Sequence, residues 1–245
     1  MQDQLEGRNP VLEALRSGRA LNKILISKDV ERHSAIAEIL HLAKEKKVPI
    51  EWLSPEILRT KTSISSPQGV IAYASAKDYS DIHDLLEISR LKNEAAFYVI
   101  LDGLEDPHNL GAILRTADAC GVHGVIIPQR RAVGLTGTVA KVSAGAIEYV
   151  PVARVVNLNN AIRTLKENNV WIIGIDKGGK NPFTGFDFKL PTAIVIGSEG
   201  KGISRLVKEN CDEIVSIPMK GNISSLNASV AAGVVMYEVL RQRTA

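Results

Sequence analysis

Aromatic residues and cysteines are scarce in this sequence, and both shortages argue against particular classes of function. Only 4% of the 245 residues are Phe, Trp or Tyr, which argues against a nucleic-acid surface built from many stacked rings. The two cysteines, Cys120 and Cys211, lie far apart and form no CxxC pair. We therefore expect neither a disulfide nor a metal site, and a reducing cytoplasm is the simplest location.

Long apolar runs are missing as well. The longest runs have about the length of buried strands, far below the ~20 residues that cross a bilayer. The first ten residues, MQDQLEGRNP, contain no apolar core and predict no signal peptide. We expect a cytoplasmic protein with no membrane partner. The net charge of +3 is compatible with nucleic-acid binding without demonstrating it, because phosphate binding depends on a local basic patch.

Charge and hydrophobic pattern divide the chain into two parts. Residues 1–77 read as a small α/β unit and carry 12 Lys or Arg against 9 Asp or Glu. Residues 78–93 are acidic and predict a connector with one short helix. Residues 94–245 alternate apolar strands with helices, and such unbroken apolar runs are typical of a parallel sheet covered on both faces. The sequence therefore predicts an α/β protein with a small first domain and a larger second one.

Three predicted strands of the second part end in Gly-rich or polar loops. The strand at 97–102 is followed by the loop and helix of 103–115, the strand at 193–196 by the loop 197–204, and the strand at 213–217 by the segment 218–229. Ligands of open parallel sheets bind outside the carboxyl ends of the strands. We therefore expect the functional site where these three loops meet.

The Gly-rich loop after residue 196 matches neither common nucleotide motif. A Walker A loop requires Ser or Thr after its Gly-Lys pair, whereas Gly202 follows Lys201 here. The dinucleotide fingerprint is absent from residues 102–111, and Arg205 breaks the spacing that Gly200 and Gly202 could begin. A simple chain turn remains the alternative for this loop taken alone.

The three loops resemble the motifs of a known family. NLGAILRTA at 109–117 resembles the first motif of the SpoU class of SPOUT methyltransferases, IGSEGKGI at 196–203 the second, and IPM at 217–219 with SLNASVA at 225–231 the third. GRNPVLEAL at 7–15 is similar to the substrate-binding domain of the RlmB branch. Their order and spacing agree with the family, so that the resemblance covers nearly the whole chain.

This resemblance implies a fold, an activity and partners. It implies a SPOUT domain with a carboxyl-terminal trefoil knot over residues 94–245, and a small L30e-like RNA-binding domain over residues 1–77. The activity would be methyl transfer from S-adenosylmethionine to the ribose 2′-hydroxyl of a guanosine in large-subunit (23S) ribosomal RNA. The enzyme would be a homodimer with the site at the subunit interface. The cofactor would lie against Gly197, Glu199, Gly200, Ile217, Met219 and Leu226.

By the same family match, the catalytic candidates are Asn109, Arg115, Glu199, Ser225 and Asn227. Arg115 is the strongest of them, because a guanidinium can hold the phosphate beside the target ribose in bidentate fashion. An arginine stays protonated in proteins, so we favour positioning and electrostatic activation over a role as general base. The proton would then leave through a substrate phosphate or water.

Ordinary structural explanations compete with these roles. Asn109, Ser225 and Asn227 could simply cap helices, Arg115 could be a solvated helix residue, and Glu199 could bridge to Lys201 within a turn. His108 lies outside the matching positions, and we expect a surface histidine.

Arg130 and Arg131 directly follow a predicted strand and are candidate RNA contacts, with a solvated turn as the alternative. Within the enzyme class, a transfer-RNA ribose methyltransferase and a resistance-type ribosomal RNA methyltransferase remain open. A non-catalytic RNA-binding protein is the rival from another class.

Overall fold

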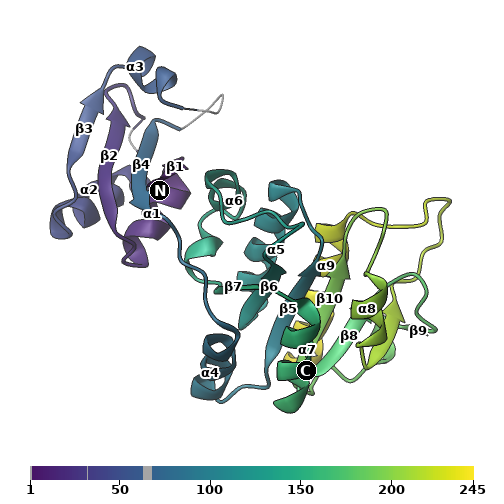
Figure 1. The fold of residues 1–245 in the computed structure, drawn as a ribbon. Coiled ribbons are helices and arrows are strands. Elements are labelled where there is room, and N and C mark those ends of the chain that lie inside the picture. Colours follow the sequence, from purple (N-terminus) through teal and green to yellow (C-terminus); the bar gives the residue numbers. More distant parts are fainter. Residues whose placement is uncertain (1, 32, 63–67) are drawn as a thin grey trace. The chain divides into compact units, whose positions relative to one another are not determined.

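The computed structural model of the chain describes residues 2–31, 33–62 and 68–245. They form two compact units, each containing its own β-sheet (Figure 1). Unit 1 consists of Met1–Asp78 and Leu135–Tyr149, and unit 2 of Tyr79–Gly134 and Val150–Ala245. Because unit 1 takes a segment from the middle of the chain, its boundary differs from the one expected from the sequence.

Unit 1 is built around a mixed four-stranded sheet. Its strands are β1 (Gln2–Glu6), β2 (Leu21–Ser27), β3 (Ile50–Leu53) and β4 (Val70–Ser75), in the order β1-β4-β2-β3. β2 runs parallel to β3, and β4 is antiparallel to both β1 and β2. The helices are α1 (Arg8–Arg16), α2 (Ser34–Glu45) and α3 (Pro55–Thr60). The small α/β unit expected at the amino terminus is therefore present, with one more strand, β1, than the sequence predicts.

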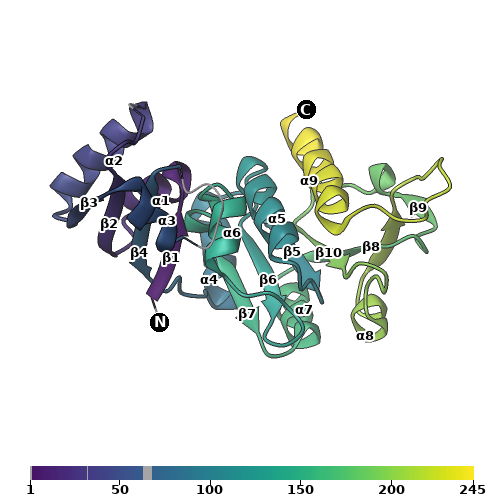
Figure 2. The same ribbon diagram turned by 90° about the horizontal axis from the view of Figure 1, so that it is seen from above.

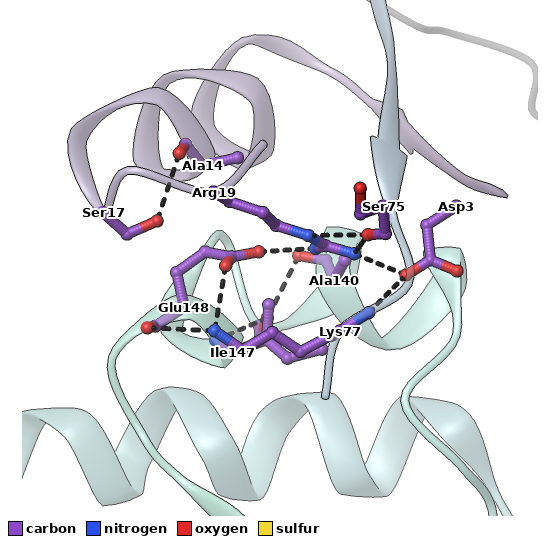
Figure 3. Close-up of polar contacts among 10 residues, drawn as sticks. Asp3, Ala14, Ser17, Arg19, Ser75, Lys77, Ala140, Ile147 and Glu148 are labelled. Atoms are coloured by element: carbon purple, nitrogen blue, oxygen red, sulfur yellow. Dashed lines mark hydrogen bonds and ion pairs between the residues drawn. The ribbon is translucent and has the colours of Figure 1, made fainter. Parts of the chain in front are cut away.

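The segment Leu135–Tyr149 is fixed in unit 1 by buried charges. It contains α6 (Gly137–Val142) and the 3-10 helix η1 (Ala146–Glu148). Glu148, whose side chain is 1% exposed, accepts hydrogen bonds from Arg19 at 2.7 Å and Lys77 at 3.1 Å. Figure 3 shows the Arg19 guanidinium between Glu148 and Asp3. A buried charge is costly unless it is paired, so that these ion pairs tie the segment to the amino-terminal strands.

Unit 2 contains a seven-stranded sheet in which all neighbouring strands are parallel. The strand order is β7-β6-β5-β10-β8-β11-β9. The strands are β5 (Phe97–Asp102), β6 (Gly124–Pro128), β7 (Val152–Val155), β8 (Trp171–Ile175), β9 (Asn181–Pro182), β10 (Thr192–Gly197) and β11 (Glu213–Ser216). This arrangement confirms the parallel sheet predicted from the apolar runs.

Helices cover both faces of this sheet (Figure 2). α5 (Pro107–Ala119) packs against α9 (Ala228–Thr244) on one face, where Arg243 lies over the ring of Phe97. α4 (Ile82–Lys92), α7 (Leu158–Glu167) and α8 (Arg205–Glu209) lie on the other. The segment expected as a connector forms α4, whose Leu85 is buried in the core of unit 2. In the described ranges, no helix is long and apolar enough to cross a membrane.

Candidate active site

The first turn of α5 presents Asn109 to the interior of unit 2. The helix begins with Pro107 at its first position, and its cap is Asp106, whose carboxylate accepts the His108 amide at 2.8 Å. Asn109 is only 4% exposed. Because Asp106 is the cap, the Asn109 side chain does not cap the helix and instead reaches residues far away in the sequence.

The three loops meet in a closed triangle of hydrogen bonds. The Glu199 Oε1 atom accepts a bond of 2.9 Å from Asn109 Nδ2 and one of 2.7 Å from Asn227 Nδ2. Asn227 Nδ2 also donates to Asn109 Oδ1 at 2.9 Å. These residues are 28 to 118 positions apart, and they meet because the carboxyl ends of parallel strands share one edge of the sheet. Two amides thus hold a carboxylate by one of its oxygens.

Asn227 has a second role at the start of α9. Its Oδ1 atom accepts the backbone amides of Ser229 at 2.9 Å and Val230 at 3.3 Å, which makes it the cap of that helix. Asn227 therefore caps α9 and also belongs to the hydrogen-bond triangle. Since its oxygen is fixed by the helix, its amide nitrogen is aimed at Glu199 and Asn109.

The loop that carries Glu199 turns so tightly that its glycines are required. The Ser198 amide donates to the Gly202 carbonyl at 3.1 Å, and the Gly202 amide returns a bond of 2.9 Å. A Cβ atom on Gly197 would lie 2.1 Å from the Gly202 carbonyl carbon, and Gly200 has a φ of +84°. No other residue type fits both positions without strain.

A cavity of about 540 Å³ lies beside this loop. Every predicted cofactor contact lines it, and so do the catalytic candidates Ser225 and Asn227. The lining residues among those predictions are Gly197, Glu199, Gly200, Ile217, Met219, Ser225, Leu226 and Asn227. The volume falls within the range of ~300–1,000 Å³ found for small-molecule sites. The residues predicted from the strand ends and motifs thus line one cavity.

The cavity also has a wall that the sequence analysis missed. Ile175, Asp176 and Lys177 line it from the end of β8. Asp176 is partly buried, and its Oδ1 atom accepts bonds of 2.8 Å from Lys208 Nζ and from the Gly178 amide. The signal was available, because Asp-Lys-Gly-Gly directly follows a predicted apolar strand.

Comparison with known proteins identifies the family. The SpoU rRNA Methylase family matches residues 96–237, and the family of RNA 2′-O ribose methyltransferase substrate-binding domains matches residues 4–80. The chain belongs to the SpoU methylase family. It is thus an RNA 2′-O-ribose methyltransferase, as the motif resemblance predicted.

Relatives and solved structures agree with this assignment over almost the full length. The chain is 48% identical over 241 residues to the TrmH family tRNA/rRNA methyltransferase YacO of Bacillus subtilis, covering 98% of this chain and 96% of the relative. It is 51% identical over 237 residues to a TrmH family tRNA/rRNA methyltransferase of Staphylococcus saprophyticus, covering 97% and 94%. The crystal structure of the SpoU methyltransferase AviRb from Streptomyces viridochromogenes, in complex with AdoMet, has a TM-score of 0.83 at 28% identity. That match covers 99% of this chain and 91% of AviRb.

Four candidates of this SpoU methyltransferase lie outside the cavity lining: Asn109, which reaches it only through Glu199 and Asn227, and three arginines. Arg115 is exposed on α5, and the described residues offer it no hydrogen bond or ion pair. Arg130 and Arg131 are exposed in the turn after β6, where Arg131 has a φ of +58°. His108 is exposed, as expected of a surface histidine. In a single copy of the chain, none of the three predicted arginines lines the cavity.

The described residues contain no candidate metal centre. Among those residues there is no group of three or more His, Cys, Asp or Glu side chains placed to hold an ion. Lys141, Ser143 and Gly145, which resemble a further family stretch, lie in unit 1 and do not line the cavity.

Proposed function

We propose that this SpoU enzyme transfers the methyl group of S-adenosylmethionine to the ribose 2′-hydroxyl of a guanosine in large-subunit ribosomal RNA. The observation that carries the proposal is the convergence of Asn109, Glu199 and Asn227 at a cavity of cofactor size. The trefoil knot implied by the family resemblance remains part of the proposal.

The cavity fits the chemistry of S-adenosylmethionine. Ile175, Ile196, Ile217 and Leu226 supply apolar walls for an adenine ring, and the backbone of the Gly-rich loop supplies polar groups along one side. The Glu199 carboxylate complements the positive charge of a sulfonium. Bound there, the cofactor would supply an electrophilic methyl group.

The residues of the triangle would order the reacting end of the site. The described hydrogen bonds of Glu199 use only Oε1, which leaves Oε2 available to the substrate or cofactor. Ser225 is exposed at the same cavity and offers a hydroxyl that can donate or accept. Alignment of a hydroxyl with a methyl group is worth several orders of magnitude in rate without any general base. We therefore assign these residues to positioning, with the proton leaving through a substrate phosphate or water.

A second copy of the chain would complete the site. Val230, Val234 and Tyr237 are 50%, 38% and 55% exposed and follow the helical spacing i, i+4, i+7 on α9. Exposed apolar faces of this kind mark protein interfaces. α9 packs against α5, which carries the exposed Arg115. A homodimer formed through this face would bring Arg115 of one subunit toward the cavity of the other, where it would hold the phosphate of the target nucleotide.

Unit 1 and the turn after β6 would bind the RNA. Unit 1 belongs to a family of substrate-binding domains, and Lys44, Lys46 and Lys47 are exposed on it. Arg130 and Arg131 offer a second basic surface on unit 2. Deleting residues 1–93 would not test RNA binding by unit 1 alone, because Glu148 would lose both of its cationic partners. Replacing the three lysines by glutamate keeps unit 1 folded, and we expect weaker RNA binding with unchanged affinity for S-adenosylmethionine.

Mapping of 2′-O-methyl groups in total cellular RNA, with and without the gene, tests the proposal. We expect one guanosine of large-subunit ribosomal RNA to lose its methyl group and to regain it only with an intact Arg115. Loss of a transfer-RNA methyl group would favour the transfer-RNA alternative instead. A ribosomal site whose methylation alters antibiotic sensitivity would favour the resistance type. An unchanged map, with purified protein that binds RNA but no S-adenosylmethionine, would favour a non-catalytic RNA-binding protein.

A further inference from the structure

The Gly-rich loop has almost no packing of its own at the tip. A Cβ atom placed on Gly200 would meet no heavy atom within 4 Å, and Glu199, Gly200 and Lys201 are exposed. The two backbone bonds between Ser198 and Gly202 close the loop but attach it to nothing else. The position of Glu199 therefore depends on what holds the residues at the base of the loop.

Two aspartates hold that base from opposite sides. Asp102 is the last residue of β5 and pairs with Gly197 of β10; its Oδ2 atom accepts the Ser204 amide at 2.6 Å. Asp176 follows β8, the other neighbour of β10, and its carboxylate lies against the base of the loop, where Oδ2 would be 3.0 Å from a Cβ atom on Gly202. The base of the loop thus lies between carboxylates from the two strands that flank β10.

Asp176 is itself held in place by further donors. Lys208 Nζ and the Gly178 amide both donate to its Oδ1 atom at 2.8 Å, and the side chain is 14% exposed. Burial raises the pKa of this carboxyl, but the hydrogen bonds from Lys208 and Gly178 and the lysine's charge outweigh burial and lower the pKa below its ordinary value. The carboxylate is therefore charged at neutral pH and accepts charge-assisted bonds, which are the stronger kind.

We propose that Asp102 and Asp176 are positioning residues: they clamp residues 202–204 and so keep Glu199 within hydrogen-bond distance of Asn109 and Asn227. The inference rests on the proposed function, because its consequence is tight binding of S-adenosylmethionine. Neither aspartate needs to touch the reacting atoms. Each acts through the loop, whose glycines would otherwise leave it free to sample other conformations.

Asp212 provides a matched control at the opposite end of β8. Its carboxylate accepts the Ile172 amide at 2.8 Å and pairs with Lys166 at 2.7 Å. Like Asp176, it accepts a backbone amide and pairs with a lysine, but it does not line the cavity. Asp212→Ala should lower the melting temperature without changing affinity for the cofactor.

The first experiment measures binding of S-adenosylmethionine by calorimetry and amide exchange of the ligand-free protein. We expect Asp102→Ala and Asp176→Ala to weaken binding at least tenfold and to speed exchange of the amides at 198–204, whereas Asp212→Ala does neither. Asp102→Asn keeps an oxygen acceptor for Ser204 and should recover most of the affinity. If all three alanine variants lose cofactor affinity equally, the aspartates only stabilise the fold in general and the proposed clamp is wrong.

A double variant tests whether the clamp acts through Glu199. If it does, Asp102→Ala combined with Glu199→Ala should bind the cofactor as Glu199→Ala alone does. If the fold-losses of cofactor affinity in the two single variants multiply in the double variant, Asp102 acts independently of Glu199 and the mechanism is refuted. Failure of the unaltered protein to bind S-adenosylmethionine would instead refute the proposed function, so the two ideas fail by different results.

Discussion

Replacing Asn109 by aspartate would place a second carboxylate against Glu199, at a point where the two residues now share a hydrogen bond of 2.9 Å. The bond from Asn109 Nδ2 is lost, and a hydrogen bond to a charged acceptor contributes about 2 kcal/mol. Two carboxylates about 3 Å apart repel by about 5 kcal/mol at an effective dielectric of 20. Because Glu199 is exposed, solvent screening reduces this repulsion, and we expect a further loss of about 2 kcal/mol.

The two contributions differ in their dependence on pH. Repulsion raises the pKa of the introduced carboxyl in the folded state, so that the folded variant binds more protons than the unfolded chain. Its stability is therefore lost as pH rises through that raised pKa and regained at lower pH. Asn109→Ala loses the bond to Glu199 and also the bond from Asn227 Nδ2, but it adds no charge. Its deficit of about 3 kcal/mol should change little with pH.

Urea unfolding at pH 5, 6.5 and 8 measures both contributions. The two tryptophans, Trp52 and Trp171, lie one in each unit, so a Trp52→Phe background leaves fluorescence from unit 2 alone. At pH 8 the free energy of unfolding of Asn109→Asp should lie about 1 kcal/mol below that of Asn109→Ala, and at pH 5 the order should reverse because the aspartate keeps the bond from Asn227. Identical pH profiles for the two variants would refute the placement of Asn109 against Glu199.

Three further predictions concern other parts of unit 2. Arg115→Ala should abolish methyl transfer while leaving the melting temperature unchanged, since the described residues give this side chain no partner; substantial remaining activity, measured with labelled cofactor, would contradict its role. Gly197→Ala should weaken binding of S-adenosylmethionine at least tenfold in calorimetry, because its Cβ atom would lie 2.1 Å from the Gly202 carbonyl carbon; unchanged affinity would mean that the loop tolerates rearrangement. Burial lowers the pKa of His123 below its ordinary 6.5, against the opposing effect of the hydrogen bond that His123 Nε2 donates to Glu94. The unfolded chain therefore binds the extra proton, and stability falls as pH drops through 6.5. His123→Gln should flatten that part of the stability profile, and an unaltered slope between pH 7 and 5 would assign it to other groups.

The three loops that border the cavity could be identified from the sequence because each is marked by residues that are close together in the chain. Each of the three loops follows an apolar strand, and the geometry of a parallel sheet brings strand ends together whatever the intervening sequence. Asn227 could also be assigned as a helix cap from its place before an apolar helical run. The triangle of side chains follows from these local features and the family motifs.

Other features depend on distant contacts that leave no local pattern. The polar pentapeptide at 2–6 becomes β1 only because β4 pairs with it, and Glu148 joins unit 1 only through Arg19 and Lys77, more than 70 residues away. In the sequence Asp176 resembles any polar residue after a strand, and only the folded chain brings the Lys208 donor to it. In each case the structure depends on a contact with a residue far away in the sequence, which no local pattern indicates.

The central claim is that this cavity and its Asn109–Glu199–Asn227 triangle carry methyl transfer to an RNA ribose. Its most direct test is to incubate the purified protein with S-adenosylmethionine and ribosomal RNA from cells lacking the gene, and to measure 2′-O-methylated nucleosides by mass spectrometry. The account predicts one new 2′-O-methylguanosine per large-subunit RNA with the unaltered protein, and none with Asn227→Ala. Methylation at a base atom, or undiminished ribose methylation by Asn227→Ala, would contradict it.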